Sequence, residues 1–241
     1  MVCVLGIIGG SGFYSVMKGE ERHVETPFGW EKVQLGRFGK ATVAFIPRHG
    51  PTHIIPPHKI NHRANLYAMN KVGAKHVVGI NACGIISKFR PGEIMTIADF
   101  LAFHLGAVTF HDHFATGAKH EDMSEPYSKR LNALIAKAGR KVKIDVKSGG
   151  VVATTFGPRF ESPAEIKAFK MLGANLVSMT SAYEAILARE LGLEYSSIAI
   201  GTNYAAGMSK KQLSHQEVLD MMAKSEAKVI KIVAALAGMV E

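Results

Sequence analysis

Hydroxyl, amide, guanidinium and imidazole side chains stand at the ends of several apolar, strand-like runs in this 241-residue chain. Such donors are what a phosphate group requires, and the charged ones bind it most strongly. An aromatic ring, a carboxylate and an amide are what a purine edge requires. Because ligands bind outside the carboxyl ends of strands in open α/β sheets, we expect these residues to share one pocket. They are Ser11, Arg48, His49, Asn81, Ala82, Phe160, Glu161, Met179, Thr180 and Asn203.

The strand expected at the centre of the sheet is the apolar run over residues 77–80. Apolar residues between Lys75 and a polar turn are typical of a buried parallel strand. We expect this strand to stop at Asn81 and a turn of small residues, Ala82 and Gly84, to follow. Asn81 is thereby placed where a ligand meets backbone amides and an amide side chain.

Apolar periodicity and turn signals divide the rest of the chain into strands and helices. A helix is predicted to begin after Ser162, because Pro163 and Glu165 complete a capping box there. No linker or repeat interrupts the pattern, which indicates one α/β domain over residues 1–241. The other elements are expected as strands over residues 2–8, 32–35, 41–46, 149–155, 176–180 and 195–201, and as helices over residues 61–72, 128–138, 183–191 and 216–240.

Two patterns suggest a cofactor or a metal and fail on inspection. The glycine-rich turn over residues 9–12 could cradle a phosphate or be a tight turn only. It lacks the last glycine of the dinucleotide-binding pattern. Four histidines follow within residues 49–62, but adjacent prolines prevent a helix there, and no cysteine or carboxylate is interspersed. We therefore expect neither a dinucleotide nor a metal.

The chain carries a formal charge of +9. Its basic residues are scattered and form no block with interleaved aromatic side chains. This favours a solvated basic surface and an anionic small substrate over nucleic acid. A non-catalytic nucleotide- or nucleic-acid-binding protein remains the alternative that the charge alone supports.

Hydropathy and cysteine usage bear on the compartment. No apolar run of about eighteen residues is present, so no membrane span is expected. The first residues lack the basic start and the cleavage site of a signal peptide. Cys3 and Cys83 stand in apolar contexts and are expected to be buried free thiols rather than a disulfide. We therefore expect a cytoplasmic protein.

Several motifs follow one another along the chain, namely Gly9-Gly10-Ser11-Gly12, Arg48-His49-Gly50, the segments 53–56 and 61–65, Gly157-Pro158-Arg159-Phe160-Glu161 and Met179-Thr180-Ser181. In this order, over nearly the whole chain, they resemble the trimeric purine nucleoside phosphorylase and methylthioadenosine phosphorylase family. The resemblance implies an α/β fold, a single domain with a mixed central β-sheet flanked by helices. It also implies a pentosyltransferase with orthophosphate as co-substrate and no metal or organic cofactor, assembled as a homotrimer or a dimer of trimers.

The resemblance also assigns roles at the phosphate and ribose. It implies that Met179 lies against the ribose and that Phe160 stacks on the base. The residues it assigns to phosphate are Ser11, Arg48, His49, Asn81, Ala82 and Thr180.

At the purine edge the resemblance implies Glu161 and Asn203. His215 resembles the histidine that bonds the ribose 5′-hydroxyl in the nucleoside phosphorylase branch. His120 resembles a residue that reaches into the neighbouring subunit's site near the 5′ end.

Three departures from the methylthioadenosine branch indicate the base. That branch has Thr-Ala where this chain has Asn81-Ala82, and a small hydroxyl residue where Glu161 follows Phe160. It has Asp-Tyr-Asp where this chain has Asn203-Tyr204-Ala205. The differences imply a 6-oxopurine nucleoside, inosine or guanosine, with methylthioinosine (or methylthioadenosine) as the alternative.

The expected reaction is phosphate-dependent cleavage to the free base and ribose 1-phosphate, in purine salvage. The residues expected to take part in catalysis are Asn203, Glu161 and His49. Asn203 donates to N7 or O6 as negative charge grows on the leaving purine, and Glu161 accepts from N1–H. His49 is expected to be a phosphate ligand, not a general base. Hydrolysis by water in place of phosphate is the remaining alternative.

Overall fold

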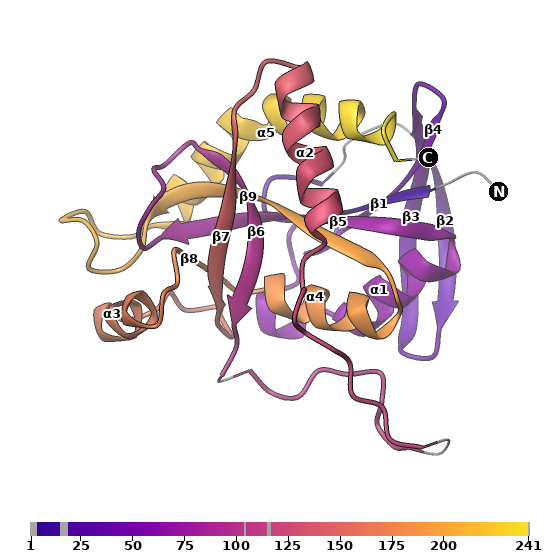
Figure 1. Ribbon diagram of the computed structural model, residues 1–241, viewed down its shortest axis with the longest axis horizontal. Helices are drawn as coiled ribbons and strands as arrows, with labels where there is room; N and C mark the ends of the chain where they lie inside the picture. The colour runs from indigo at the N-terminus through magenta and orange to yellow at the C-terminus, as the bar shows by residue number, and fades with distance from the viewer. Residues whose placement is uncertain (1–3, 15–18, 104, 115–116, 241) are drawn as a thin grey trace.

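The computed structural model describes residues 4–14, 19–103, 105–114 and 117–240, and its described strands form a mixed, nine-stranded sheet (Figure 1). The strand order is β2-β3-β4-β1-β5-β8-β7-β6-β9. The strands are β1 Val4–Gly9, β2 Gly19–Thr26, β3 Gly29–Phe38, β4 Ala41–Pro47, β5 Ala74–Ile85, β6 Ile94–Leu101, β7 Val146–Thr154, β8 Leu176–Ser178 and β9 Glu194–Tyr204.

The sheet closes on itself through β5. This strand pairs in parallel with β1 on one edge and with β9 on the other. Near its end it also pairs with β8, while β9 pairs with β6. Strands β5, β8, β7, β6 and β9 therefore form a ring, and β1 to β4 extend from it as an open sheet.

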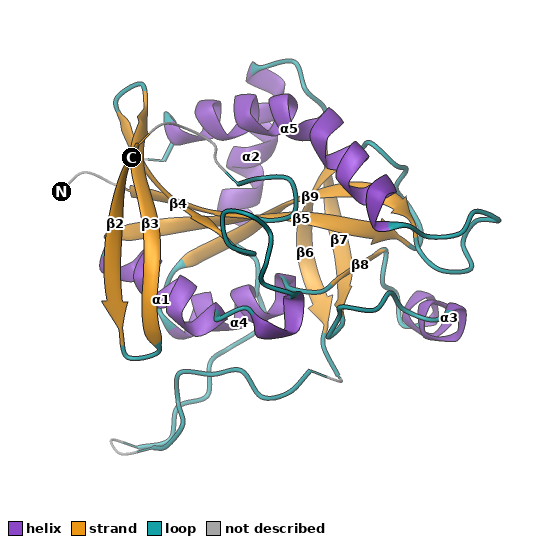
Figure 2. Ribbon diagram, turned by 180° about the vertical axis from the view of Figure 1, so that it is seen from behind, coloured by secondary structure: helices purple, strands orange, loops and turns teal. Residues whose placement is uncertain are grey.

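Helices cover both faces of the sheet, with α2 and α5 on one face and α1 and α4 on the other (Figures 1 and 2). Helix α3 lies apart, at the side of β7 and β8. The described helices are α1 His62–Lys71, α2 Lys129–Lys141, α3 Pro163–Met171, α4 Ser181–Glu190 and α5 His215–Ala237, with a 3₁₀ turn at Pro57–Lys59.

Strand β1 has apolar side chains that pack on both faces of the sheet. Leu5 and Ile7 pack into the core under α2 and α5, whereas Ile8 packs into the core over α1 and α4. All three are fully buried. Successive strand side chains point to opposite faces, so an uninterrupted apolar run is what a strand covered on both sides needs. Each such side chain contributes roughly 1.5–3 kcal/mol of burial free energy.

Most predicted elements are confirmed, with ends shifted by a few residues. Asn61, Ser128 and Ser162 cap α1, α2 and α3 through their side chains, and Ser162 forms the predicted capping box with Glu165. The expected hairpin is β3 and β4. Cys83 is a buried free thiol, and Cys3 lies outside the described residues.

The prediction that the central strand ends at Asn81 is wrong. β5 runs on to Ile85 and stays paired with β9, which itself continues through Asn203 to Tyr204. Ala82 and Gly84, which suggested a turn, are strand residues that line a cavity. Small side chains at these positions keep that cavity open.

Among the described residues, no helix has the length and the apolar character needed to span a membrane.

Candidate active site

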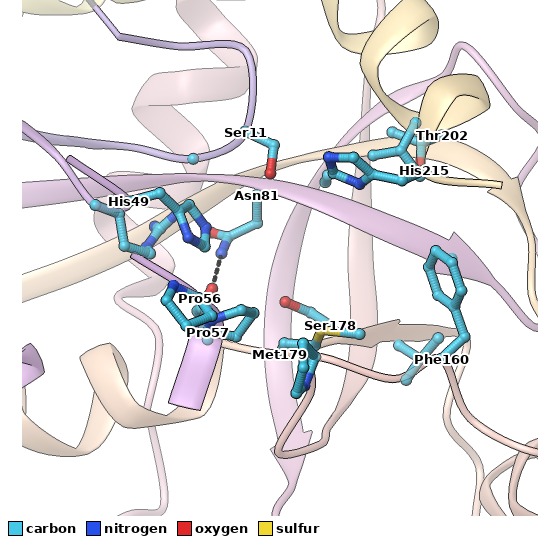
Figure 3. A pocket seen from close by; sticks show the side chains of 18 of the residues that line it. Ser11, His49, Pro56, Pro57, Asn81, Phe160, Ser178, Met179, Thr202 and His215 are labelled. Carbon is cyan, nitrogen blue, oxygen red and sulfur yellow. Dashed lines mark hydrogen bonds between the residues drawn. The ribbon is translucent and has the colours of Figure 1, made fainter. Parts of the chain in front are cut away.

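A cavity of about 510 Å³ opens where β5, β8 and β9 approach the loops after β1 and β4 (Figure 3). Nearly all the residues expected at the site line it. They are Ser11, Arg48, His49, Asn81, Ala82, Phe160, Glu161, Met179, Thr180, Asn203 and His215. The sequence therefore predicted which residues line the pocket, but it did not predict the hydrogen bonds and ion pairs that position their side chains.

The exception is His120. It lies on the long connection between β6 and α2, exposed and packed edge-on against Phe114. It does not line the cavity of its own chain.

The backbone of β5 is open beside the cavity. β1 stays paired with β5 only as far as Gly79, and β8 joins only at Gly84. Residues 80–83 of β5 therefore have no paired strand on the edge that β1 and β8 share. Such an unpaired edge offers backbone N–H groups to a ligand, which is the role expected of the carboxyl end of a strand in this fold class.

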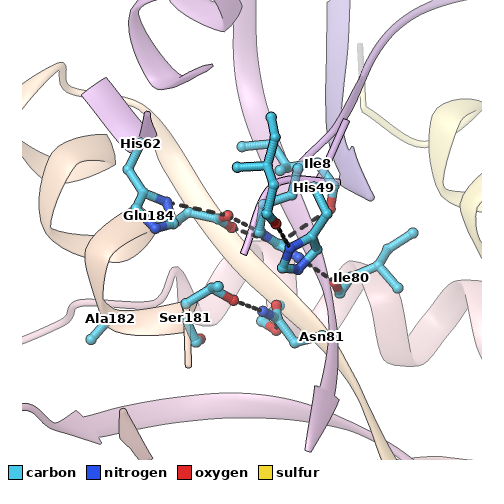
Figure 4. A network of polar contacts seen from close by, with 12 residues as sticks. Ile8, His49, His62, Ile80, Asn81, Ser181, Ala182 and Glu184 are labelled. Atoms are coloured by element: carbon cyan, nitrogen blue, oxygen red, sulfur yellow. Dashed lines mark hydrogen bonds and ion pairs between the residues drawn. The ribbon is translucent and has the colours of Figure 1, made fainter. Parts of the chain in front are cut away.

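The Arg48 guanidinium is fully buried and bonds Glu184 and the Ile80 carbonyl, two residues labelled in Figure 4. Its Nε and Nη2 donate to the two carboxylate oxygens of Glu184, the Nη2 bond being 2.9 Å. Nη1 donates to the Ile80 carbonyl at 2.9 Å, and Nη2 reaches the Ile8 carbonyl at 3.4 Å. A single N–H of Nη1 is left for a ligand. Most of the hydrogen bonds of Arg48 therefore hold the structure together, and only one remains for an anion.

Glu184 is the functional residue that the sequence analysis missed. It is fully buried on α4 and also accepts from the Tyr195 hydroxyl at 2.6 Å. Gly79 makes room for this contact, because a Cβ there would overlap the Tyr195 hydroxyl. A glutamate among small and apolar residues of one helix face was the available signal, since buried carboxylates are paired.

The Asn81 side chain makes two hydrogen bonds within the protein. Its Nδ2 donates to Thr180 Oγ1 at 2.9 Å, and its Oδ1 accepts from Ser197 at 2.8 Å. Asn81 therefore positions Thr180, and its second Nδ2–H and its backbone remain for a ligand.

Thr180 stands at the N-cap of α4 without capping the helix through its own side chain. The positive end of the helix dipole is consequently directed at the cavity, a favourable place for an anion. Ser11, in the turn after β1, lies across the cavity, and Figure 3 shows its hydroxyl directed inward.

His49 is held in one tautomer. Its Nδ1 lies 2.8 Å from the Ile55 carbonyl, so that nitrogen carries the hydrogen and Nε2 is left as an acceptor. Burial and the neighbouring Arg48 lower the pKa of His49 to about 4. The imidazole is therefore neutral near pH 7.

The far end of the cavity carries different groups. Glu161 is buried beside Phe160, and Thr155 donates to its Oε1 at 2.6 Å. Burial raises the pKa of Glu161, an effect that the Thr155 hydrogen bond partly opposes. Asn203 accepts from the Thr202 hydroxyl and donates to the Tyr204 carbonyl at 3.0 Å. These bonds fix the orientation of its amide and leave one N–H for a ligand.

A family model described as the phosphorylase superfamily matches residues 4–237. The chain belongs to this superfamily, which confirms the family, the α/β fold and the enzyme class expected from the motifs.

Its relatives carry more particular names. A probable 6-oxopurine nucleoside phosphorylase of Moorella thermoacetica is 41% identical over 90% of this chain and 86% of its own. A 6-oxopurine nucleoside phosphorylase of Pyrococcus furiosus is 39% identical over 96% and 91%. A probable S-methyl-5′-thioinosine phosphorylase of Methanopyrus kandleri is also 39% identical, over 95% and 90%.

Solved structures agree on the fold. The methylthioadenosine phosphorylase of Schistosoma mansoni in complex with adenine superposes with a TM-score of 0.93 at 32% identity. The superposition covers 99% of this chain and 92% of that one.

The buried ion pair gives a first prediction. Arg48→Met leaves the Glu184 charge unpaired in the interior, and we expect it to lower the free energy of unfolding by about 3–5 kcal/mol. Adding Glu184→Gln removes that charge and keeps an acceptor for Tyr195, so the double variant should be more stable than Arg48→Met alone. Urea denaturation at pH 7 measures the free energy of unfolding of both variants. If the losses caused by Arg48→Met and by Glu184→Gln simply added in the double variant, the pairing would be contradicted. Arg159→Met, in the exposed Arg159–Glu165 pair, serves as the control.

A second prediction concerns His62, which is buried and stacks on Tyr183. Neither ring nitrogen has a hydrogen-bond partner among the described residues, although Nδ1 lies 3.9 Å from Glu184 Oε1. Burial and Arg48 lower its pKa to about 3. As the pH falls below 6.5, His62 becomes protonated in the unfolded chain but stays neutral in the folded protein, so the free energy of unfolding falls.

His62→Gln removes this contribution. We expect the loss of unfolding free energy between pH 7 and pH 5 to shrink by about 2 kcal/mol relative to the native chain. His58→Gln, at an exposed position of the preceding loop, should keep the native pH dependence. An unchanged pH dependence in His62→Gln would show that His62 takes up its proton equally in both states.

Proposed function

We propose that this protein is a purine nucleoside phosphorylase that cleaves 6-oxopurine nucleosides, inosine and guanosine, with orthophosphate. The products are the free base and ribose 1-phosphate, and the role is purine salvage. The observation that carries the proposal is the buried carboxylate of Glu161, next to Phe160 in the chain, in the cavity that Asn203 and the proposed anion-binding groups also line. The names of the Moorella and Pyrococcus relatives support the same activity.

Phosphate is proposed to bind against the open edge of β5. Ser11 and Thr180 offer hydroxyl groups, Ala82 its backbone, and Arg48 its remaining N–H. These donors, with the dipole of α4, hold the anion beneath C1′ of the ribose. A phosphate oxygen then forms a bond to C1′ as the glycosidic bond breaks, and the electron pair of that bond leaves with the purine.

The base edge supports a 6-oxopurine. An ionised Glu161 has only acceptors and matches the N1–H of hypoxanthine or guanine, but it would face a lone pair in adenine. The remaining N–H of Asn203 can donate to N7 or O6 as negative charge develops there. Because this bond strengthens toward the transition state, it contributes to rate as well as to binding.

His49 is proposed to hold phosphate through Nε2. Since its Nδ1–H is bound to Ile55, Nε2 can only accept, and its natural partner is a P–OH group. This favours a protonated phosphate at that position and fits a ligand better than a general base acting on the purine.

A second candidate substrate is methylthioinosine. Leu213 and Val218 lie beside His215 in the cavity wall and offer an apolar surface to a 5′-methylthio group. The name of the Methanopyrus relative supports this substrate. Turnover of inosine against methylthioinosine under saturating phosphate decides between them.

We also propose a homotrimer, alone or paired into a dimer of trimers. His120 stands outside the cavity of its chain, on a connection where Phe103 and Phe114 are 71% and 50% exposed. Exposed aromatic side chains are frequent at subunit contacts. This supports a site completed by His120 of a neighbouring subunit. The enzyme is proposed to act in the cytoplasm with orthophosphate as co-substrate and without metal or organic cofactor.

Ser11→Ala tests the phosphate end. A hydrogen bond to a charged ligand contributes about 1.5–3 kcal/mol, so the KM for phosphate should rise at least about tenfold. The KM for inosine should stay within about twofold. Ser148→Ala, an exposed serine of β7 away from the cavity, is the control. Equal changes in the two KM values would contradict the assignment.

Asn203→Asp tests the base end. Each mismatched buried polar contact costs roughly 1–3 kcal/mol, so the native enzyme should prefer inosine over adenosine by at least about two orders of magnitude. Asn203→Asp should narrow this ratio by depressing inosine turnover, while Glu161 still resists full conversion. The measurement is kcat/KM for both nucleosides at fixed phosphate. A native enzyme that cleaves adenosine as fast as inosine would refute the proposed base contacts.

A further inference from the structure

Two consecutive threonines stand at the end of β7, and their hydroxyl groups bond to different parts of the protein. Thr154 is fully buried, and its Oγ1 accepts from the Ala182 N–H of α4 at 3.2 Å. Thr155 is also buried, and its hydroxyl donates to Glu161 Oε1 at 2.6 Å. Thr155 is not among the described residues that line the cavity, so it can act on a ligand only through Glu161.

The bond between Thr155 and Glu161 spans the connection from β7 to α3. The backbone N–H of Thr155 donates to the Ser178 carbonyl of β8 at 2.8 Å, which fixes Thr155 to the sheet. Glu161 directly precedes Ser162, the residue that caps α3. The Thr155 hydroxyl thus ties the carboxylate to the sheet. A carboxylate has about four lone-pair sites, so this bond leaves acceptor positions for a ligand.

The same hydroxyl acts on the charge of Glu161. Burial raises the pKa of Glu161, and the Thr155 hydrogen bond opposes this because it stabilises the ionised form. Two nearby charges act in opposite directions, since Glu165 raises the pKa and Arg159 lowers it. These two side chains also bond to each other at 2.8 Å. Of the groups around Glu161, Thr155 favours the ionised form most strongly.

The charge of Glu161 decides which purine edge it matches. An ionised carboxylate only accepts, and it fits the N1–H of a 6-oxopurine. A protonated carboxyl carries an O–H, which can donate to the N1 lone pair of a 6-aminopurine. Protonation of Glu161 therefore reverses the base preference of this contact.

We propose that Thr155 is a positioning residue for base selection, whose hydroxyl holds Glu161 as an ionised acceptor and so favours 6-oxopurines over 6-aminopurines. The proposal rests on the phosphorylase function proposed above. Without the hydroxyl, burial acts on the carboxyl unopposed by this bond, and Glu161 takes up its proton at a higher pH. Base selection should then weaken at a higher pH as well.

The test follows the ratio of kcat/KM for inosine to kcat/KM for adenosine from about pH 5 to about pH 8, at one saturating phosphate concentration. The two nucleosides differ only in the base. The ionisation of phosphate and the amount of folded enzyme therefore cancel in the ratio, as do the side chains that titrate elsewhere in the cavity wall. The described charged or titratable side chains there, besides Glu161, are Arg48, His49, His53 and His215.

The native ratio should fall with decreasing pH as Glu161 becomes protonated. Thr155→Val keeps the shape of the side chain and removes the hydroxyl. It should move the midpoint of this fall upward by about one pH unit or more, the effect of losing a hydrogen bond to a charged group. Thr155→Ala is a second variant without the hydroxyl, and Thr155→Ser, which keeps it, should retain the native midpoint.

Thr154→Val is the matched control, because it removes the neighbouring hydroxyl, which bonds to Ala182 rather than to Glu161. It should keep the native midpoint. The same pH dependence of the ratio in Thr155→Val and in the native enzyme would overturn the role of Thr155. A midpoint in Thr155→Ser or in Thr154→Val that moves as far as in Thr155→Val would overturn it too. Failure of the native enzyme to release hypoxanthine from inosine with phosphate would instead refute the phosphorylase function.

Discussion

The buried ion pair of Arg48 and Glu184 is the interaction on which the proposed phosphate site of this protein depends. Neither charge can remain in the interior alone, so each requires the other in place. Arg48 follows β4, Glu184 belongs to α4, and the Ile80 carbonyl that Arg48 also binds belongs to β5. One guanidinium thus fixes the relative positions of three elements whose ends line the cavity at the proposed anion site.

The second constraint is the way β5 changes partners. β1 leaves it after Gly79 and β8 joins it at Gly84, so the strand edge between them is free for a ligand. Asn81 stands in this interval and uses its side chain to hold Thr180 at the start of α4. The backbone edge and the helix dipole consequently converge on one place. In the proposed phosphate site, the main chain of β5 and the start of α4 therefore act together with side chains that these contacts hold in place.

The other end of the cavity works through fixed donors and acceptors. Thr155 orients Glu161, and the neighbours of Asn203 on β9 orient its amide. His49 follows the same principle, because the Ile55 carbonyl determines which of its nitrogens faces the ligand. In the proposed function, selection between purines then depends on matching polar atoms rather than on shape alone. This is the stronger form of discrimination, since a mismatch leaves a buried polar atom unpaired.

The sequence by itself determined the elements and the members of the site. Capping residues such as Ser162 and apolar runs such as β1 act locally, and local patterns suffice to predict them. The order of the motifs brought Ser11, Phe160, Glu161 and Asn203 into one expected pocket, which the structure bears out. The tertiary structure alone decided the continuation of β5 past Asn81 and the pairing of Glu184 with Arg48. Each of these depends on contacts between segments far apart in the chain, and small residues in a strand have the same local signature as a turn.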